Sequence, residues 1–333
     1  MPLTVADFTE TDLLARIFPR LLVADAAVIG PGDDAALLAA PDGRVVISID
    51  TLVENQDFRL NRRNGHITDG FDVGWKAAAQ NLSDINAMGG RATSLLVSLT
   101  LPGATPIDWV DSFADGMAAA IVQLGAVGCG VIGGDLGRGR ELAASIAVTG
   151  TLDSRAPVLR SGAVAGDILA LAGTVGRAAA GLALMESDHD ARSLDSEMMR
   201  LVLSQRRPWP PLKAGPAAAA AGARSAIDVS DGLIRDAGRI AKASGATIRL
   251  NPGAVKLLAV PLMSAGSLLK VDPTDWVLTG GEDYGILATF PLGTELPKGF
   301  QEVGDVLDGG SVVEVGSTLH DAGGWDHFGG RHS

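Results

Sequence analysis

Apolar and polar residues follow one another along the first half of the chain in patterns that predict alternating strands and helices. The β-branched run 45–49 has the length of a strand and ends at Asp50, and 95–101 repeats that pattern. Between these runs, apolar residues recur every three or four positions from Phe71 to Ile85. This spacing predicts a helix with one apolar face, which ends at Gly89-Gly90.

A second helix and two further strands are predicted before residue 150. Thr105-Pro106-Ile107-Asp108 resembles a capping box with proline at the first helical position, and the apolar face that follows ends near Gly125. Short apolar runs at 130–132 and 142–149 predict strands. The order strand, helix, strand, helix, strand, strand is typical of an α/β or α+β domain.

The pattern restarts after Arg160-Ser161-Gly162, which indicates a second domain. The 333 residues fit two domains of roughly 150 residues each, and we place their boundary near 153–160, giving domains 1–153 and 154–333. In the second domain we expect strands at 167–172, 225–229 and 284–290, and helices at 178–185, 214–223 and 233–244. The glycine-, histidine- and aromatic-rich tail 321–333 is expected to be disordered.

Composition narrows the classes of partner. Twenty-seven Lys and Arg against 39 Asp and Glu give a formal charge of −12, which repels nucleic-acid phosphates and anionic lipid. We therefore expect neither nucleic acid nor a membrane as a partner, and expect any phosphate to be bound through metal. Hydrophobic residues at 47% exclude wholesale disorder.

The cysteine content and the apolar stretches predict a cytoplasmic protein. The single cysteine, Cys129, cannot form an intramolecular disulfide and is expected to be a buried structural thiol. The N-terminal segment carries the acidic residues Asp7 and Glu10, whereas a secretory signal has a basic region followed by an apolar one. The longest apolar stretch, 117–134, is interrupted by Gln123 and five glycines, so we expect a helix end, a turn and a strand instead of a membrane span.

The positions of the acidic residues distinguish this chain from other α/β proteins. Six acidic motifs lie beside glycines or at the ends of apolar runs: Gly32-Asp33-Asp34, Ile49-Asp50, Ser83-Asp84, Gly133-Gly134-Asp135, Asp228-Val229-Ser230-Asp231 and Gly280-Gly281-Glu282-Asp283. One Gly-Asp pair alone is more often a turn, but six together favour a binding site. Oxygen ligands without a His/Cys cluster select Mg²⁺ or Mn²⁺, and neighbouring glycine lets a phosphate approach the backbone.

The usual nucleotide-binding signatures are absent from the sequence. It has no P-loop motif and no protein-kinase motif set, and Gly30-Pro31-Gly32 lacks the third glycine of a dinucleotide fingerprint. If the protein uses ATP, its fold is therefore neither a P-loop fold nor a protein-kinase fold.

Six blocks of sequence resemble the thiamine-monophosphate kinase family, in order over nearly the whole chain. These blocks are Gly30 to Ala36, Asp50-Thr51-Leu52-Val53, Lys76 to Gly89 with Asn81-Leu82-Ser83-Asp84, Gly133-Gly134-Asp135, Ala226 to Leu233, and Gly280 to Tyr284. The family belongs to the ATP-binding superfamily of aminoimidazole ribonucleotide synthetase and selenophosphate synthetase. The resemblance implies a homodimer whose N-terminal domains form a shared β-barrel, with an α/β C-terminal domain.

The resemblance also implies roles for individual residues. Several Mg²⁺ ions would be held by Asp34, Ser48, the Ile49 carbonyl, Asp50, Asp84, Asp135, Asp228 and Asp231. Arg160 and Ser230 would contact ATP, and Glu282 and Trp325 the thiamine moiety. Asp50, Asp84, Asp135 and Arg160 would carry the catalysis.

Two positions depart from the family pattern. Gly285 stands where a second glutamate usually follows Glu-Asp-Tyr, and Asp57 stands where the family usually has a histidine on the substrate side. A carboxylate would repel the acceptor phosphate, so we expect Asp57 to point away from it, or else to hold an additional metal ion.

The implied reaction converts ATP and thiamine monophosphate to ADP and thiamine diphosphate by direct in-line transfer. The acceptor phosphate has a second pKa of about 6 and is mostly ionised at pH 7, so a general base is dispensable. Two alternatives stay open: another ATP-dependent activity of the superfamily, and a non-catalytic thiamine-phosphate binding protein. Selenophosphate synthesis is disfavoured because no cysteine lies near the N-terminus. A binding protein that has lost its catalytic activity is disfavoured because every expected acidic ligand is present.

Overall fold

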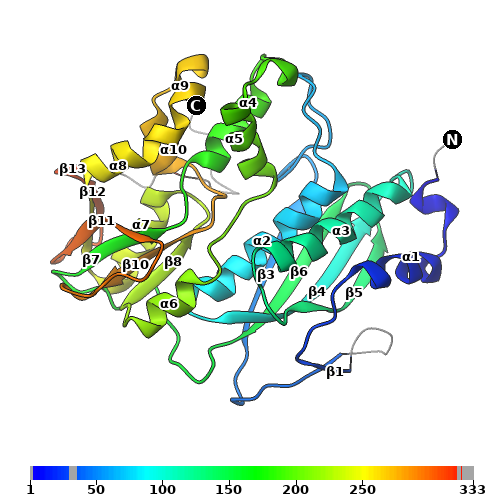
Figure 1. Cartoon of the computed structure of the whole chain (residues 1–333), viewed down its shortest axis with the longest axis horizontal. Helices are drawn as coiled ribbons and strands as arrows, with labels where there is room; N and C mark the ends of the chain where they lie inside the picture. Colours follow the sequence, from blue (N-terminus) through cyan, green and yellow to red (C-terminus); the bar gives the residue numbers. More distant parts are fainter. Residues whose placement is uncertain (1–2, 30–35, 321–323, 325–333) are drawn as a thin grey trace. The chain divides into compact units, whose positions relative to one another are not determined.

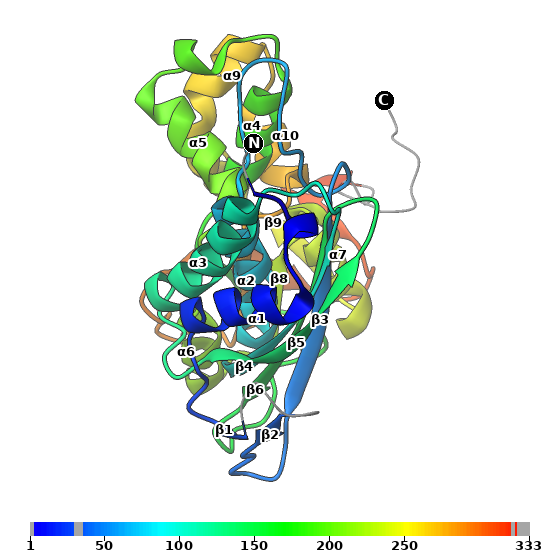
Figure 2. The ribbon, with the colours of Figure 1, turned by 90° about the vertical axis from the view of Figure 1, so that its right-hand side faces the viewer.

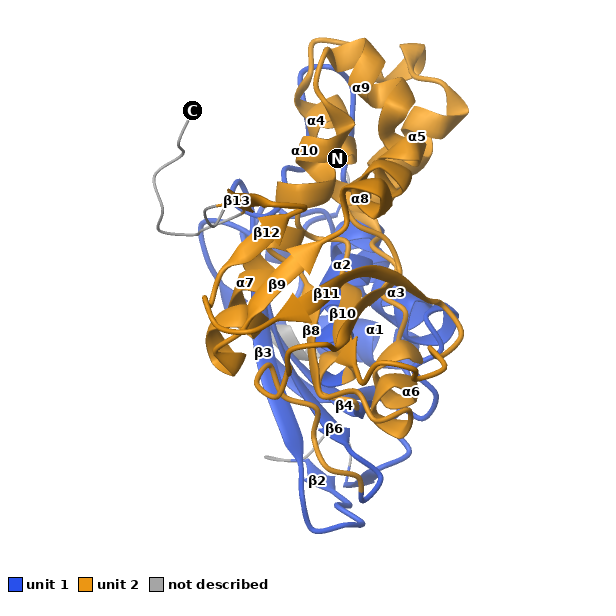
Figure 3. Cartoon of the chain, turned by 90° about the vertical axis from the view of Figure 1, so that its left-hand side faces the viewer, with its two compact units in different colours: residues 1–85, 90–154 blue, residues 86–89, 155–333 orange. Residues whose placement is uncertain are grey.

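The computed structural model describes residues 3–29, 36–320 and 324. The chain divides into two compact units (Figure 3). Unit 1 comprises residues 1–85 and 90–154, and unit 2 comprises residues 86–89 and 155–333. The mixed α/β character predicted from the sequence is confirmed in both units.

Unit 1 is built on a four-stranded sheet with the order β3-β6-β4-β5. Its elements are η1 (Val5–Asp7), α1 (Glu10–Ile17), η2 (Phe18–Arg20), β1 (Ala27–Ile29), β2 (Leu37–Leu38), β3 (Val46–Val53), α2 (Gly70–Ala87), β4 (Arg91–Leu101), α3 (Ile107–Gln123), β5 (Gly130–Arg138) and β6 (Ala143–Thr151). β6 pairs antiparallel with β3 and β4, whereas β4 and β5 are parallel. Figure 2 shows α2 and α3 along the same face of this sheet.

The two faces of the sheet follow from side-chain alternation along β3. Ser48 and Leu52 point toward the helix-covered face, where Leu52 is 2% exposed. Ile47 and Ile49 point to the other face and are 72% and 64% exposed. Among the described residues of unit 1, no helix covers that second face (Figure 2).

Two local predictions for unit 1 are wrong in detail. Thr105 does not begin a capping box, because α3 starts at Ile107 with Pro106 as its N-cap and no side-chain capping bond. The first long strand also does not end at Asp50, since β3 continues to Val53. Asp50 is therefore presented by alternation within a strand, not by a strand end.

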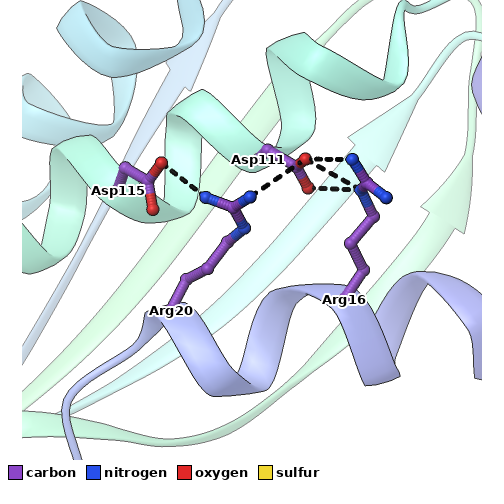
Figure 4. A network of polar contacts seen from close by, with 4 residues as sticks. All are labelled: Arg16, Arg20, Asp111 and Asp115. Carbon is purple, nitrogen blue, oxygen red and sulfur yellow. Dashed lines mark hydrogen bonds and ion pairs between the residues drawn. The ribbon is translucent and has the colours of Figure 1, made fainter.

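The helix α1 and the following η2 are fixed to α3 by four charged side chains (Figure 4). Arg16 donates to both carboxylate oxygens of Asp111, which is 7% exposed, and Arg20 bridges Asp111 and Asp115. These pairs connect positions about ninety residues apart in the sequence, so they help to fix the N-terminal segment on the unit.

The apolar stretches behave largely as expected. Residues 117–134 form the end of α3, a turn and the start of β5, and Cys129 is buried, which raises the pKa of its thiol to about 12. One other stretch, Pro252–Leu269, is long and apolar enough to cross a membrane by length and composition, which by itself is weak evidence for a span. It consists of two α-helices separated by a 3-10 turn at Val260–Leu262, which contains Pro261.

Unit 2 is built on a seven-stranded sheet with the order β13-β12-β9-β11-β7-β10-β8. Its elements are β7 (Ile168–Ala172), α4 (Arg177–Glu186), η3 (Ala191–Ser193), α5 (Ser196–Arg206), α6 (Ala214–Ala220), β8 (Ser225–Val229), α7 (Leu233–Ser244), β9 (Thr247–Leu250), α8 (Pro252–Ala259), η4 (Val260–Leu262), α9 (Met263–Leu269), α10 (Pro273–Thr279), β10 (Gly285–Phe290), β11 (Phe300–Leu307), β12 (Val313–Val315) and β13 (Thr318–His320). In Figure 1, α4, α5, α9 and α10 cluster at one end of this unit.

Alternation along the central strands gives unit 2 two cores. Leu169 and Leu171 of β7 pack with side chains of α4, α5, α7 and α8 on one face. Ala170 and Ala172 pack on the other face with Phe290 and the alanines of α6. The small residues on the second face let α6 approach the sheet closely.

Candidate functional site

Strand β3 and helix α2 bring together three of the predicted metal ligands in unit 1. The Ser48 hydroxyl donates a hydrogen bond of 2.5 Å to Oδ2 of Asp84. One turn away, the backbone N–H of Asp50 donates to Oδ1 of Asn81 at 3.2 Å, and the Asn81 amide donates to the Ala77 carbonyl. Asn81 and Asp84 lie three residues apart on α2, so both face β3.

The donor atoms of this cluster have the chemistry that Mg²⁺ requires. A serine hydroxyl and aspartate carboxylates are hard oxygen ligands, which suit Mg²⁺ better than Zn²⁺. The side chain of Ile49 points to the exposed face, so only the backbone of Ile49 is available to this cluster, as expected. Ser48, Asp50 and Asp84 therefore fit a magnesium site in their donor chemistry.

Asp135 lies on the opposite face of the same sheet. It pairs with Ser98 of β4, and Ser98 pairs with Ser145 of β6, whose hydroxyl contacts that of Thr51 at 2.8 Å. Paired residues in a sheet share a face, so this row of polar residues is opposite to Ser48 and Asp50. Unit 1 does not bring Asp135 together with Asp50 and Asp84.

The carboxylate of Asp57 is engaged by its own loop. The backbone N–H of Val53 donates to Asp57 Oδ2 at 2.7 Å, while the N–H of Asp57 donates to the Val53 carbonyl. These two bonds close the turn that follows β3. The geometry agrees with an Asp57 side chain that stabilises this turn.

In unit 2 the loop that carries Ser230 and Asp231 is held by a buried carboxylate. Asp236, in the first turn of α7, is 0% exposed and accepts the N–H groups of Ser230 and Asp231 at 3.0 Å each. Burial raises the pKa of Asp236 to about 6, although those N–H groups and Arg239 oppose the shift. The backbone of the predicted ATP-binding loop is therefore fixed before any ligand arrives.

Two arginines of α7 lie beside the same loop. Arg239 bonds to Asp236 Oδ1 at 2.5 Å and also to the carboxylate of Asp231, and Arg235 lies 3.9 Å from Asp231 Oδ2. Asp228 precedes the loop at the end of β8, where it is 6% exposed and pairs with Ile286. Of the two metal ligands predicted in unit 2, Asp231 therefore lies beside the positive charges of Arg235 and Arg239.

The loop that carries Glu282 lies against the Ser230 loop. The Glu282 N–H donates to the Ser230 carbonyl at 2.8 Å. Asp283, 4% exposed, accepts the N–H groups of Arg177 and Ala178 at the start of α4 and the hydroxyl of Thr174. Burial raises the pKa of Asp283 to about 6, and these donors oppose that shift.

Arg160 lies at the other end of α7 from Ser230. Its carbonyl accepts a bond of 3.4 Å from the Ser244 hydroxyl, and Ser244 is the last residue of α7, whereas Ser230 and Asp231 directly precede its first turn. A helix of 12 residues is about 18 Å long. Within unit 2, the two predicted ATP contacts are therefore separated by roughly the length of this helix.

Two predicted site residues, Asp34 and Trp325, lie outside the described residues, as does most of the tail 321–333. Within the residues that are described, no three Asp, Glu, His or Cys side chains gather closely enough to hold a metal ion together. The eight-residue Mg²⁺ shell implied by the resemblance stays a prediction.

Sequence reasoning assigned no role to three residues that hold the predicted site residues. Asn81 had a signal, since it lies three residues before Asp84 on the predicted helix. In the sequence, Asp236 resembles an ordinary acidic residue in the first turn of a helix. Gln205 of α5 donates to Glu282 Oε2 at 3.3 Å, and these two residues lie 77 positions apart in the chain. Only the tertiary structure identifies those two.

Comparisons with known proteins show the family of the chain. Residues 32–152 match the model of the AIR synthase related protein, N-terminal domain. The chain is 44% identical over 303 residues to thiamine-monophosphate kinase of Mycobacterium tuberculosis, covering 91% of this chain and 86% of that protein. The crystal structure of thiamine-monophosphate kinase from Stenotrophomonas maltophilia is similar with a TM-score of 0.78, 31% identity and coverage of 94% and 98% of the two chains.

A structure of AaThiL complexed with AMPPCP and TMP is also similar, with a TM-score of 0.74, 27% identity and coverage of 96% of each chain. Sequence blocks, oxygen-donor geometry and similarity over nearly the full length agree. The chain belongs to the thiamine-monophosphate kinase family, whose members are kinases.

Proposed function

We propose that the chain transfers the γ-phosphoryl group of ATP directly to thiamine monophosphate in a reaction that requires Mg²⁺. The observation that carries this proposal is the contact of β3 with α2, where Ser48, Asp50 and Asp84 of the family's acidic blocks lie together. The similar structure with AMPPCP and TMP supports the choice of the two substrates.

The chemical difficulty is electrostatic, since the anionic acceptor phosphate must approach an anionic γ-phosphoryl group. Mg²⁺ supplies the positive charge that offsets this repulsion when it is bound. Ser48, Asp50 and Asp84 would hold it, and the Ser48 hydroxyl would also orient Asp84. A proton acceptor for the nucleophile is not needed, because the acceptor phosphate is mostly ionised at pH 7.

The remaining roles rest on the resemblance to the family. We assign Asp34, the Ile49 carbonyl, Asp135, Asp228 and Asp231 to Mg²⁺, Arg160 and Ser230 to ATP, and Glu282 and Trp325 to the thiamine moiety. The fixed backbones of the Ser230 and Glu282 loops support the roles of those two residues.

We also propose that two copies of the chain form a homodimer through the exposed face of the unit 1 sheet, within domain 1–153. Ile49 of β3, Ala147 of β6 and Leu96 of β4 lie in one row across that face, and Ile49 and Leu96 are 64% and 39% exposed. A second copy covering this face would complete the shared barrel that the family resemblance implies. Ile49→Lys should shift the protein toward monomer in sedimentation velocity experiments.

The same proposal places the reaction in the cytoplasm, where ATP is available. The chain has a single cysteine and therefore no intramolecular disulfide, which fits a reducing compartment.

The test is incubation of the purified chain with ATP, Mg²⁺ and thiamine monophosphate, followed by chromatographic separation of the thiamine phosphates. Thiamine diphosphate and ADP should form in equal amounts, and excess EDTA should stop both. Equal turnover with thiamine itself in place of thiamine monophosphate would contradict the assigned acceptor. Product without divalent cation would contradict the role of Asp50 and Asp84.

A further inference from the structure

The loop 280–284 of unit 2 is held rigidly on both sides. Gly281 packs so tightly that a Cβ there would lie 2.1 Å from the Ser230 carbonyl oxygen. On its other side, the Asp283 carboxylate accepts the N–H of Ala178 at 3.1 Å and the Thr174 hydroxyl at 2.9 Å. The backbone between these two anchors has little freedom to move.

Glu282 lies between the anchors in a conformation that side chains rarely adopt. Its φ is +68°, in the left-handed region, which costs roughly 1–2 kcal/mol for a residue with a Cβ. Such strain persists only where the surroundings impose it, and it is common at ligand-binding positions. The conformation fixes the direction in which the Glu282 side chain leaves the backbone.

Gln205 fixes the far end of the same side chain. It lies in the last turn of α5, is 5% exposed, and its Nε2 donates to Glu282 Oε2 at 3.3 Å. A buried primary amide loses its hydration, so an apolar residue of similar shape would be cheaper to bury if packing were the only requirement. The amide instead makes a charge-assisted bond to a carboxylate, which is stronger than a bond between neutral groups.

We propose that Gln205 is a positioning residue for the acceptor substrate: it holds the Glu282 carboxylate in the orientation that binds the thiamine moiety. The inference rests on the proposed function, in which Glu282 contacts that moiety. An aminopyrimidine presents an amino N–H donor in the plane of its ring, so its recognition by a carboxylate depends on the angle of the carboxylate plane. Backbone strain and the Gln205 bond together set that angle.

The test compares Gln205→Met, which keeps the shape and removes the donor, with the wild type. The acceptor KM, and the Kd for thiamine monophosphate from isothermal titration, should both rise roughly tenfold, equivalent to about 1.4 kcal/mol. The KM for ATP and kcat should stay within about twofold of wild type. Gln301→Met on β11, an exposed position, is the matched control and should leave all values unchanged.

A second variant and a double-mutant cycle exclude a purely structural role. Gln205→Glu keeps the volume and sets two carboxylates against each other, so the acceptor KM should rise further than in Gln205→Met. In a Glu282→Ala background, Gln205→Met should change the acceptor KM by less than about twofold, because the oxygen that accepts the Gln205 bond is already gone.

The failures are distinguishable. Wild-type acceptor KM in both Gln205 variants, or equal rises in the KM for ATP and for the acceptor, would overturn the role of Gln205 while the kinase assignment stands. Absence of thiamine diphosphate with the wild-type chain would instead overturn the proposed function.

Discussion

The β3–α2 cluster of unit 1 and the Ser230–Glu282 loops of unit 2 present their acidic residues in different ways. In unit 1, Ser48, Asp50 and Asp84 belong to a strand and a helix, and the regular backbone hydrogen bonds of those elements hold them in place. In unit 2, Ser230, Asp231 and Glu282 lie in loops that buried carboxylates hold in place. Asp236 accepts the N–H groups of Ser230 and Asp231, and Asp283, next to Glu282, accepts the N–H of Ala178 in α4.

This difference has an electrostatic consequence. The buried carboxylates of Asp236 and Asp283 both have a pKa raised to about 6, because burial disfavours their charged form. The loop architecture of unit 2 therefore couples its stability to pH through these anchors. The backbone bonds within β3 and α2 do not titrate, and the contact between the two elements is made through the side chains of Ser48, Asn81 and Asp84.

The largest expected effect is the loss of turnover when a carboxylate of the β3–α2 cluster in unit 1 is removed. Asp50→Ala and Asp84→Ala should each lower kcat by roughly 1000-fold or more, because Mg²⁺ would lose one of the ligands proposed for it and would no longer offset the repulsion between the two phosphates. The thermal midpoint should change by only a few degrees, since β3 and α2 keep their backbone bonds. Asp108→Ala, an exposed first-turn acid of α3, is the control. Near-normal turnover in either site variant would refute the assignment.

The second prediction tests the titrating anchor in unit 2. The pKa of Asp283 is about 6 in the folded protein against an ordinary value of 3.8, so between these values the folded state binds more protons than the unfolded chain. This contribution to stability is present below pH 4 and is lost as the pH rises through 6. The difference in free energy of unfolding between wild type and Asp283→Asn should therefore fall, by about 2–3 kcal/mol, from pH 4 to pH 6.

Urea titrations at a series of pH values measure this difference directly. A pH-independent difference for Asp283→Asn would mean that Asp283 does not titrate as an anchor.

The third prediction concerns the scaffold of unit 1. Asp111→Ala removes the shared partner of Arg16 and Arg20 and should destabilise the protein by about 2 kcal/mol, between the values for exposed and buried ion pairs. The exposed pair Asp190–Arg192 is the control, and Arg192→Ala, which leaves the N-cap bond of Asp190 in place, should cost less than about 0.5 kcal/mol. Acceptor KM should be unchanged in both variants. A loss of stability no larger than in the control would show that this network does not hold α1.

The smallest effect on substrate binding is expected for substitution of Asp57. Because its carboxylate accepts the Val53 N–H, Asp57→Asn retains an oxygen acceptor and should change the acceptor KM by less than about twofold. A large fall in the acceptor KM would show instead that Asp57 faces the acceptor phosphate, and a collapse of activity would show that it holds a metal ion.

Much of the local structure could be predicted from the sequence because it depends on short-range periodicity. The helix from Phe71 to Ile85 is confirmed as α2, the helix 233–244 as α7, and the strand 225–229 as β8. The acids beside glycines also indicated oxygen-ligand chemistry before any fold was known. Periodicity did not indicate α8, α9 and α10, nor the last three strands. Of these strands, β12 and β13 have only three residues each, and the alternation of β11 is interrupted by a register shift between Glu302 and Gly304.

The sequence by itself predicted which residues would bind phosphate and metal, and the tertiary structure decided which of these residues lie together. Gln205 looks ordinary in the sequence because its partner Glu282 lies 77 residues away. Asp236 looks like any first-turn acid, because its bonds to the N–H groups five and six residues before it depend on how the preceding loop folds back. Asp135 is the sharpest case. The register between β4 and β5 shifts by one residue after Leu95, skipping Ile132, so Ser98 instead of Leu99 pairs with Asp135. Since strand side chains alternate with a period of two, that single residue moves Asp135 to the opposite face from Asp50 and Asp84.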